Sequence, residues 1–311
     1  MSNCTSAPAP STAEGTEGRF AHEIDPERLL GGAGAVSGRE RCRGGSGAWR
    51  WRGGGGGRAT VNPTGTIGDA YGEDMSTPRR LGLLGGVTWH SSLEYERLIN
   101  EGINKQLGGV ASGDLLVRSY NFADIAAAQE SGDWAGLARL FADDAARMAD
   151  AGAEGIVICA NTMHKIAAEV AERSGLPVID IRDAVADAVL AQGRSTVSLF
   201  ATAYTMRERF YIDHLARRGV TALVPDEPHL SEVHRVIYEE LAQGVVLPES
   251  RETIQRLASE LAEHGSDGFI AGCTEIPMLV TAADVEGPYF DALALHAEAA
   301  VRFALEDTRA T

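Results

Sequence analysis

Short apolar runs alternate with helical patterns along the chain from about residue 80 onward. The first run, 81–86, ends in a glycine turn, and the residues after it carry apolar side chains at helical spacing, namely Tyr95, Leu98, Ile99 and Ile103. Apolar runs of this length between turn residues are typical of buried strands. Strands that alternate with helices form parallel sheets with helices on both faces, so the pattern predicts an α/β fold.

The strand and helix pattern occurs twice. Predicted strands cover 81–86, 114–120, 155–159 and 178–181, and then 196–202, 222–225, 268–273 and 289–292. Predicted helices cover 88–103, 134–151, 162–174, 183–192, 205–218, 229–243, 250–264 and 293–305. Leu83 lies 76 residues before Cys159, and Leu199 lies 74 residues before Cys273. The matched spacing predicts two pseudo-symmetric domains, each a parallel sheet flanked by helices, with a cleft between their carboxyl edges.

The first 80 residues differ from the rest of the chain. They hold 17 of the 36 glycines and show no regular hydrophobic period. Such a segment buries too little apolar area to offset the entropy of ordering it. Residues 1–79 are therefore expected to be a disordered, glycine-rich N-terminal extension. Met75 directly precedes the first predicted strand and is an alternative start of the protein.

Composition excludes several functional classes. With 28 Lys and Arg against 44 Asp and Glu, the formal net charge is −16, which disfavours a nucleic-acid partner. No apolar run approaches the length of a membrane-spanning helix, so no membrane association is expected. None of the cysteines, at positions 4, 42, 159 and 273, forms a C-x-x-C pair, and no secretory signal precedes the regular part. A cytoplasmic protein with reduced thiols is expected.

Two of these cysteines stand at corresponding strand ends. Each is followed by small polar residues, which are Asn161 and Thr162 after Cys159 and Thr274 and Glu275 after Cys273. A single cysteine at a strand end most often only packs in the core. Two at repeat-equivalent positions, each before a polar turn, favour a chemical role.

Two thiols that face one cleft can exchange a proton. Each cysteine is expected beside a helix N-terminus, which would lower the pKa of its thiol. A thiolate on one side of a carbon can remove its hydrogen while a thiol on the other side returns one, which inverts the carbon without cofactor or metal. Backbone N–H groups together with Asn161, Thr162 and Thr274 suit a carboxylate. His164 and Glu275 are candidate supporting residues, and the inferred substrate is a small carboxylate with an acidic C–H.

The chain resembles the aspartate/glutamate racemase family of cofactor-independent, two-cysteine amino-acid racemases. The matching stretches are LGLLGGVTWHSS at 81–92, ICANTMHK at 158–165, LFATAYTM at 199–206, AGCTEIPMLV at 271–280 and FDALALHAEAAV at 290–301. The resemblance implies that Cys159 and Cys273 are the acid/base pair. It implies that the amino acid is held by Thr88, Asn161, Thr162, Thr202, Thr205 and Thr274. It also implies a homodimer, with one domain of 80–181 plus 285–311 and a second of 182–284.

Substrate choice within the family is indicated by two further stretches. Glu275, where a glutamate racemase would have histidine, resembles the aspartate-racemase branch. Aspartate racemases are expected to hold the side-chain carboxylate with basic residues after the second strand and on the helix after the sixth. Here the first of these stretches, 121–125, has no arginine, and Ser231 stands where lysine is expected. The chain is therefore closer to broad-specificity racemases that act on aspartate, glutamate or a wider set of amino acids.

Two alternatives remain. One is a maleate isomerase or malonate decarboxylase of the same fold, in which cysteine acts as nucleophile or single proton donor. The other is a non-catalytic carboxylate-binding protein, although binding alone does not require two thiols. A nucleotide-dependent enzyme is disfavoured because the chain has no Walker A motif and the glycines at 82, 85 and 86 do not complete a dinucleotide fingerprint.

Overall fold

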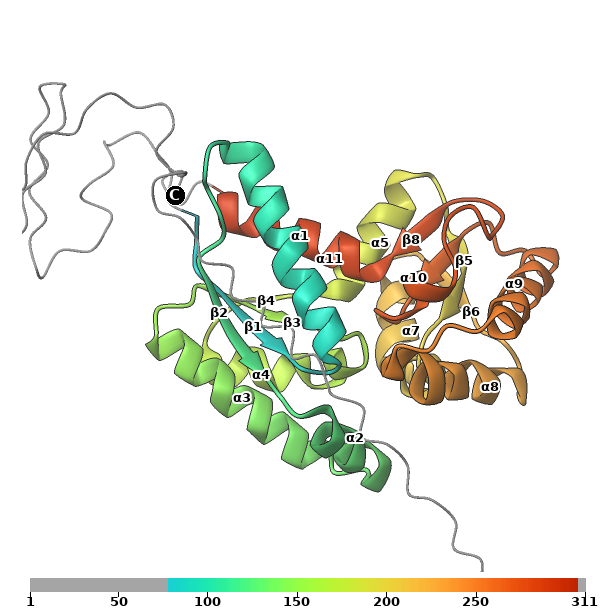
Figure 1. Ribbon diagram of the computed structural model, residues 1–311, viewed down its shortest axis with the longest axis horizontal. Helices are drawn as coiled ribbons and strands as arrows, with labels where there is room; N and C mark the ends of the chain where they lie inside the picture. The colour runs from blue at the N-terminus through green and yellow to red at the C-terminus, as the bar shows by residue number, and fades with distance from the viewer. Residues whose placement is uncertain (1–77, 307–311) are drawn as a thin grey trace, which may run out of the picture. The chain divides into compact units, whose positions relative to one another are not determined.

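The computed structural model describes residues 78–306 (Figure 1). Met75, Cys4, Cys42 and nearly all of the predicted N-terminal extension lie outside the described residues. The regular part begins close to where the sequence predicts. The backbone N–H of Arg79, just before the first strand, already donates to the carbonyl of Ala304 at 2.8 Å.

Within residues 78–306, eight strands form two parallel sheets, which confirms the predicted fold class. The first sheet contains β1 (Leu81–Gly85), β2 (Leu115–Ser119), β3 (Gly155–Ile158) and β4 (Val178–Ile179), and the second contains β5 (Thr196–Phe200), β6 (Thr221–Leu223), β7 (Phe269–Ala271) and β8 (Tyr289–Asp291). The strand orders are β2-β1-β3-β4 and β6-β5-β7-β8. Corresponding strands thus occupy the same places in both sheets, and β3 and β7 are equivalent.

The helices that connect these strands are α1 (Trp89–Leu107), α2 (Phe122–Ser131), α3 (Trp134–Asp150), α4 (Ala167–Ser174), α5 (Ile181–Ala191), α6 (Ala203–Arg207), α7 (Arg209–Arg217), α8 (His229–Arg235), α9 (Pro248–Glu263), α10 (Ile276–Leu279) and α11 (Ala292–Leu305). Shorter turns are the 3₁₀ helices η3 (Thr162–Ile166) and η5 (Leu241–Gln243) and the π-helical turn η4 (Val236–Glu240).

Several predicted helices are interrupted. The predicted helix 205–218 is divided at Glu208 into α6 and α7, and 162–174 begins as the 3₁₀ helix η3. The predicted helix 229–243 continues from α8 into the π-helical turn. The stretch 121–125 is not a loop but the start of α2, where the Asn121 side chain accepts a hydrogen bond from the N–H of Ala123. Apart from the break at Glu208, these departures place residues in the lining of the pocket described below, namely Phe122, Thr162, Ile237 and Tyr238.

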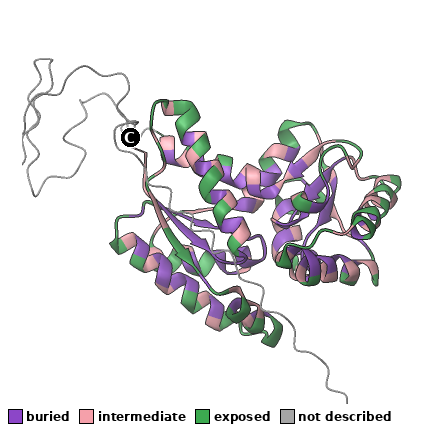
Figure 2. Cartoon of the chain, in the orientation of Figure 1, coloured by how far each residue is buried: buried purple, intermediate pink, exposed green. Residues whose placement is uncertain are grey.

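The first sheet is covered on both faces. On one face Leu84 and Ile158 pack with Phe141 of α3, whereas on the other Leu83 packs with Ile99 of α1 and with α11. The central strands β1, β3, β5 and β7 are accordingly buried almost throughout, whereas the edge strand β2 is largely exposed (Figure 2). The last helix of the described chain therefore completes the core of the first sheet.

The chain passes between the halves at two similar corners. At the β4–α5 corner Asp180 caps α5 by accepting from the N–H of Arg182, and at the β8–α11 corner Asp291 caps α11 in the same way through two N–H groups. A buried histidine secures the first corner, because Nε2 of His296 lies 2.6 Å from the carbonyl oxygen of Ile179. Burial lowers the pKa of His296 to about 3, so this ring is neutral near pH 7.

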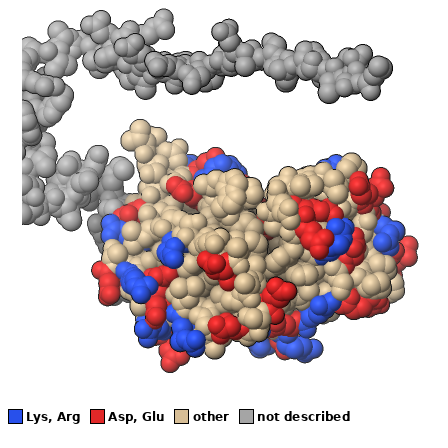
Figure 3. Space-filling view, turned by 60° about the horizontal axis from the view of Figure 1, so that its bottom comes forward, with Lys and Arg blue, Asp and Glu red and all other residues tan. Residues whose placement is uncertain are grey.

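None of the described helices combines the length and hydropathy needed to cross a membrane. On the face that Figure 3 shows, basic and acidic side chains are interspersed, and the basic ones do not gather into a patch.

Gly86 is a position where an added side chain should be poorly tolerated. It has a φ of 81°, and a Cβ there would lie 2.2 Å from the backbone nitrogen of Tyr120. We expect Gly86→Ala to lower the free energy of unfolding by more than about 3 kcal/mol, because both backbone strain and overlap contribute. Gly132 is the matched control, since it has a φ of 75° in the left-handed helical region but nothing lies near its Cβ position. Gly132→Ala should cost only about 1 kcal/mol in urea unfolding, and equal losses for the two variants would contradict this reading.

Candidate active site

A small pocket lies among the loops that follow the central strands of both sheets. Its lining residues are Val87, Thr88, Phe122, Gln129, Ala160, Asn161, Thr162, Thr202, Ile237, Tyr238, Ala242, Gly272, Cys273, Thr274 and Glu275. Because parallel strands present their carboxyl ends at one edge of the sheet, residues far apart in the chain meet here.

The structure brings most of the sequence-predicted site residues to this pocket. Those that line it are Thr88, Asn161, Thr162, Thr202, Cys273, Thr274 and Glu275. Thr205 is fully buried beside it and shares hydrogen bonds of 3.2 Å with Thr162 and 3.3 Å with Thr202. Cys159 and His164 are not among the lining residues.

The buried carboxylate of Glu275 organises one wall of the pocket. Its Oε2 accepts from Sγ of Cys273 at 3.0 Å and from Oγ1 of Thr274 at 2.8 Å. Its Oε1 accepts from Oγ1 of Thr88 at 2.6 Å and from Oγ of Ser91 at 3.1 Å. Four donors from both halves of the molecule therefore converge on one carboxylate, and one of them is a candidate catalytic thiol.

The hydroxyl of Thr88 contributes to this network rather than to helix capping. Thr88 occupies the N-cap position of α1, as the sequence suggests, but its side chain makes no capping hydrogen bond. The hydroxyl donates to Glu275 instead, since a buried carboxylate gains more from a donor than a solvated helix end does. Thr88 thus links the first half to the second.

Asn161 lacks the partners that a buried amide requires. Its side chain lines the pocket, the residue is 4% exposed, and neither Nδ2 nor Oδ1 has a hydrogen-bond partner in the part of the chain that the structure describes. An unpaired buried polar group costs about 1–3 kcal/mol. An amide in this position is suited to a ligand that both donates and accepts hydrogen bonds, such as an α-amino acid.

Cys159 lies directly behind the pocket lining. It follows β3, is 1% exposed, and belongs to the buried cluster that contains Leu83 and Tyr95. Its Sγ is 3.8 Å from the carbonyl oxygen of Val157, which is a weak contact. The residues that reach the pocket at this strand end are its neighbours Ala160 and Asn161.

Burial, rather than a helix N-terminus, dominates the acidity of both thiols. The expectation of a lowered pKa is wrong, because burial raises the pKa of Cys159 and, together with the Glu275 charge, raises the pKa of Cys273 well above its usual range. The turns that follow the two cysteines, η3 and the four-residue α10, do not offset this burial.

His164 forms hydrogen bonds that hold the segment directly after Cys159. Its Nδ1 lies 2.9 Å from the carbonyl oxygen of Ala160, and its Nε2 accepts from the N–H of Ile181 at 3.2 Å. These two bonds assign the proton to Nδ1, and burial lowers the pKa of this ring, so it is neutral. The imidazole holds the Ala160 peptide that borders the pocket without reaching the pocket itself.

Sequence reasoning missed the wall of the pocket formed by α2 and the π-helical turn. This wall contributes Phe122, Gln129, Ile237 and Tyr238. No local motif marks these residues, since they come from helices in different halves and meet only in the folded chain. The Asn121 cap signal before an alanine-rich stretch could have revealed α2.

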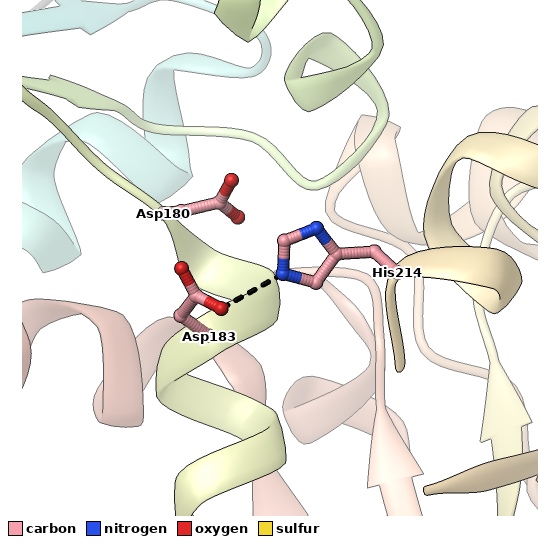
Figure 4. A group of neighbouring side chains, drawn as sticks. All are labelled: Asp180, Asp183 and His214. Atoms are coloured by element: carbon pink, nitrogen blue, oxygen red, sulfur yellow. Dashed lines mark hydrogen bonds and ion pairs between the residues drawn. The ribbon is translucent and has the colours of Figure 1, made fainter. Parts of the chain in front are cut away.

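One cluster of described residues has the spacing of metal ligands. Asp180, Asp183 and His214 lie close together, and Nε2 of His214 is 2.8 Å from Oδ1 of Asp183 (Figure 4). However, Arg182 binds the carboxylate of Asp180 and Arg218 binds that of Asp183. Guanidinium groups already neutralise these carboxylates, so the cluster is an ion-pair network joining α5 and α7.

The family model of the Asp/Glu/hydantoin racemases matches residues 84–300. The chain belongs to this family. This match confirms the resemblance that the cysteine motifs indicate. Racemases are isomerases, so the predicted class of enzyme is confirmed as well.

Solved structures of similar proteins agree with this assignment. A candidate Asp/Glu racemase from Yersinia pestis is 41% identical, with a TM-score of 0.70, and the match covers 73% of this chain and 100% of the other. An aspartate racemase homologue from Pyrococcus horikoshii is 31% identical, with a TM-score of 0.64, and the match covers the same shares, 73% and 100%.

Curated racemases match over a shorter region. A glutamate racemase from Deinococcus radiodurans is 29% identical over 150 residues, which are 46% of this chain and 49% of the relative. In this match the chain spans about half the length of the curated racemase.

The thiol acidities can be measured directly. In a Cys4→Ser, Cys42→Ser background, the pH dependence of thiol alkylation by iodoacetamide should report only Cys159 and Cys273, and we expect both to titrate above about pH 9. Glu275→Gln removes a negative charge beside Cys273, so it should lower the pH at which one of the two thiols ionises. The exposed Glu263→Gln is the control and should shift neither. A thiol that titrates below pH 8 in the parent would contradict the dominance of burial.

Proposed function

We propose that this protein is an amino-acid racemase that needs no pyridoxal phosphate and uses Cys159 and Cys273 as its acid/base pair. The observation that carries this proposal is the position of the two thiols at the ends of equivalent strands, β3 and β7, beside one pocket in a chain of the racemase family. The carboxylate bonded to Cys273 and the unpartnered amide of Asn161 support it.

The polar lining provides the groups that would hold an α-amino acid. Asn161 offers a donor and an acceptor without competing partners in the described chain. The hydroxyls of Thr162 and Thr202, which share a hydrogen bond of 2.8 Å, and that of Thr274 can rotate to donate to a carboxylate or accept from an ammonium. Thr205 holds the first two hydroxyls, and Thr88 acts through Glu275.

In the proposed reaction one cysteine starts as a thiolate and the other as a thiol. The thiolate takes the α-hydrogen as a proton, so that its S–H bond forms as the C–H bond breaks and the electron pair stays on the α-carbon. The second thiol then gives its proton to the opposite face of that carbon and becomes the thiolate. The product is the other enantiomer, and the enzyme ends with the two protonation states exchanged.

Glu275 has a supporting role in forming the reactive thiolate. Because burial raises the pKa of Cys273, its proton needs a nearby acceptor, and Oε2 of Glu275 already accepts from Sγ at 3.0 Å. Thr88 and Ser91 hold the other carboxylate oxygen. These bonds fix the orientation of the carboxylate, with Oε2 toward the thiol with which it would exchange a proton.

The pocket does not contain the basic groups that a strict aspartate racemase would need. Its described lining has no Lys, Arg or His side chain. Ser231, at the position where lysine is expected, instead donates to Glu227 and accepts from Arg207. We therefore propose a wider range of amino-acid substrates in place of strict aspartate specificity.

We also propose that the protein is a cytoplasmic homodimer. Each copy would have one domain of residues 80–181 plus 285–311 and a second of residues 182–284.

One observation favours a second candidate, a cysteine-dependent decarboxylase of malonates. Cys273 lines the pocket whereas Cys159 does not, which is the arrangement that a single proton donor would require. The two functions differ in whether Cys159 is needed, and this difference can be tested.

Serine variants of the two cysteines separate these functions. Serine has a similar size but is far harder to deprotonate, so Cys159→Ser and Cys273→Ser should each lower racemisation by orders of magnitude. In heavy water, each variant should still exchange the α-hydrogen slowly, and the two should prefer opposite enantiomers. The readout is NMR of α-deuteration with L- and D-amino acids, and Cys42→Ser is the control that should retain activity. Absence of racemisation in the parent, with decarboxylation of an arylmalonate that Cys159→Ser retains and Cys273→Ser loses, would establish the second candidate instead.

A further inference from the structure

The wall of the pocket formed by α2 and the π-helical turn contains one amide. Gln129 of α2 is only 2% exposed and lines the pocket together with the apolar Phe122, Ile237 and Ala242. Across the pocket wall, the hydroxyl of Tyr238 donates to Oε1 of Gln129 at 2.8 Å. This bond joins the first half of the molecule to the second at the pocket.

Tyr238 fixes the direction of the Gln129 amide. Burial raises the pKa of the Tyr238 hydroxyl, so it remains protonated and can donate. With Oε1 committed to Tyr238, the NH₂ group is left with Sδ of Met163, at 3.3 Å, as its acceptor among the described residues. A thioether is a weak acceptor. At least one N–H of this buried amide is thus available to a ligand in the pocket.

The electrostatic character of the pocket limits which substrate group this amide can meet. The lining includes the carboxyl group of Glu275, and no cationic side chain among the described residues lines the pocket to balance a second carboxylate. A substrate side chain with a negative charge would therefore lose hydration without gaining an opposite charge. An uncharged oxygen acceptor could take the Gln129 N–H without this penalty.

We propose that Gln129 is a specificity-determining residue that favours substrates whose side chain ends in an uncharged oxygen acceptor, as in a carboxamide. The inference rests on the proposed racemase function for the identity of the substrate as an α-amino acid. Gln129 would select the side chain of the substrate, whereas the cysteines would act at its α-carbon.

Three amino acids of nearly the same shape test this inference. Aspartate, asparagine and leucine share a branched side chain and differ in whether its end is a carboxylate, a carboxamide or a hydrocarbon. For the full-length enzyme we expect kcat/KM for α-deuteration to be at least about tenfold higher for asparagine than for leucine or aspartate, equivalent to about 1.4 kcal/mol. Calorimetric binding of the same three compounds should follow the same order.

Gln129→Met keeps the length of the side chain and removes its hydrogen bonds. The asparagine-to-leucine ratio should then fall to about one or below, in both exchange and binding. Gln255→Met is the matched control, since Gln255 is half-buried on α9 and bonds Asp284 at 3.2 Å, away from the pocket lining. The control should keep the parental ratio. Tyr238→Phe, which releases Oε1 of Gln129, should lower the ratio partially and provides a second variant if Gln129→Met does not fold.

The outcomes distinguish this inference from the function on which it rests. If amino acids are racemised but the ratio is unchanged in Gln129→Met and Tyr238→Phe, the role of Gln129 is overturned while the racemase proposal stands. If asparagine binds preferentially and loses that preference in Gln129→Met, yet no α-hydrogen exchanges, the racemase proposal falls and the binding role of Gln129 is supported. A parental enzyme that prefers aspartate over asparagine would overturn the inference outright.

Discussion

The pocket depends on a single buried carboxylate. Glu275 is 3% exposed, and a charge so far from water is stable only if it is paired or hydrogen-bonded. Because the described structure supplies hydroxyl and thiol donors to both of its oxygens, the halves must meet in one register at this point. The same requirement explains why Thr88 gives up its capping bond. This one carboxylate therefore fixes both a contact between the halves and the hydrogen bond of the Cys273 thiol.

Duplication of the fold has not produced two equivalent sites. Strand order is the same in both sheets, and Asp180 and Asp291 cap corresponding helices. Yet Cys273 has a carboxylate partner at the pocket, whereas Cys159 is packed among apolar side chains behind it. A substrate with two different faces does not need a symmetric environment. The first half instead presents Asn161 to the pocket, and the amide of this residue has no hydrogen-bond partner among the described residues.

Much of the fold could be predicted from the sequence because each strand is a short apolar run and each cysteine ends one. The positions of Thr162, Thr202 and Thr274 at the pocket also follow from strand ends in a parallel sheet. The π-helical turn that places Tyr238 could not be predicted, since its extra residue leaves no trace in a helical period. The pKa values of the two thiols could not be predicted for a similar reason. Burial, which raises them, depends on the whole fold, whereas the position of a helix N-terminus can be predicted from the local sequence.

The packing of α11 has a consequence for how the chain is made. Leu293 and Ala297 of this helix lie in the same cluster as Leu83 and Ile99 of the first half, although they are synthesised after all the described strands. Strands β5 to β7 and the helices between them, in contrast, form one uninterrupted stretch. Domains of a nascent chain can fold as soon as their segments have emerged. Strands β5, β6 and β7 can thus pair before α11 is made, while the first sheet keeps an apolar face uncovered until that helix has been synthesised.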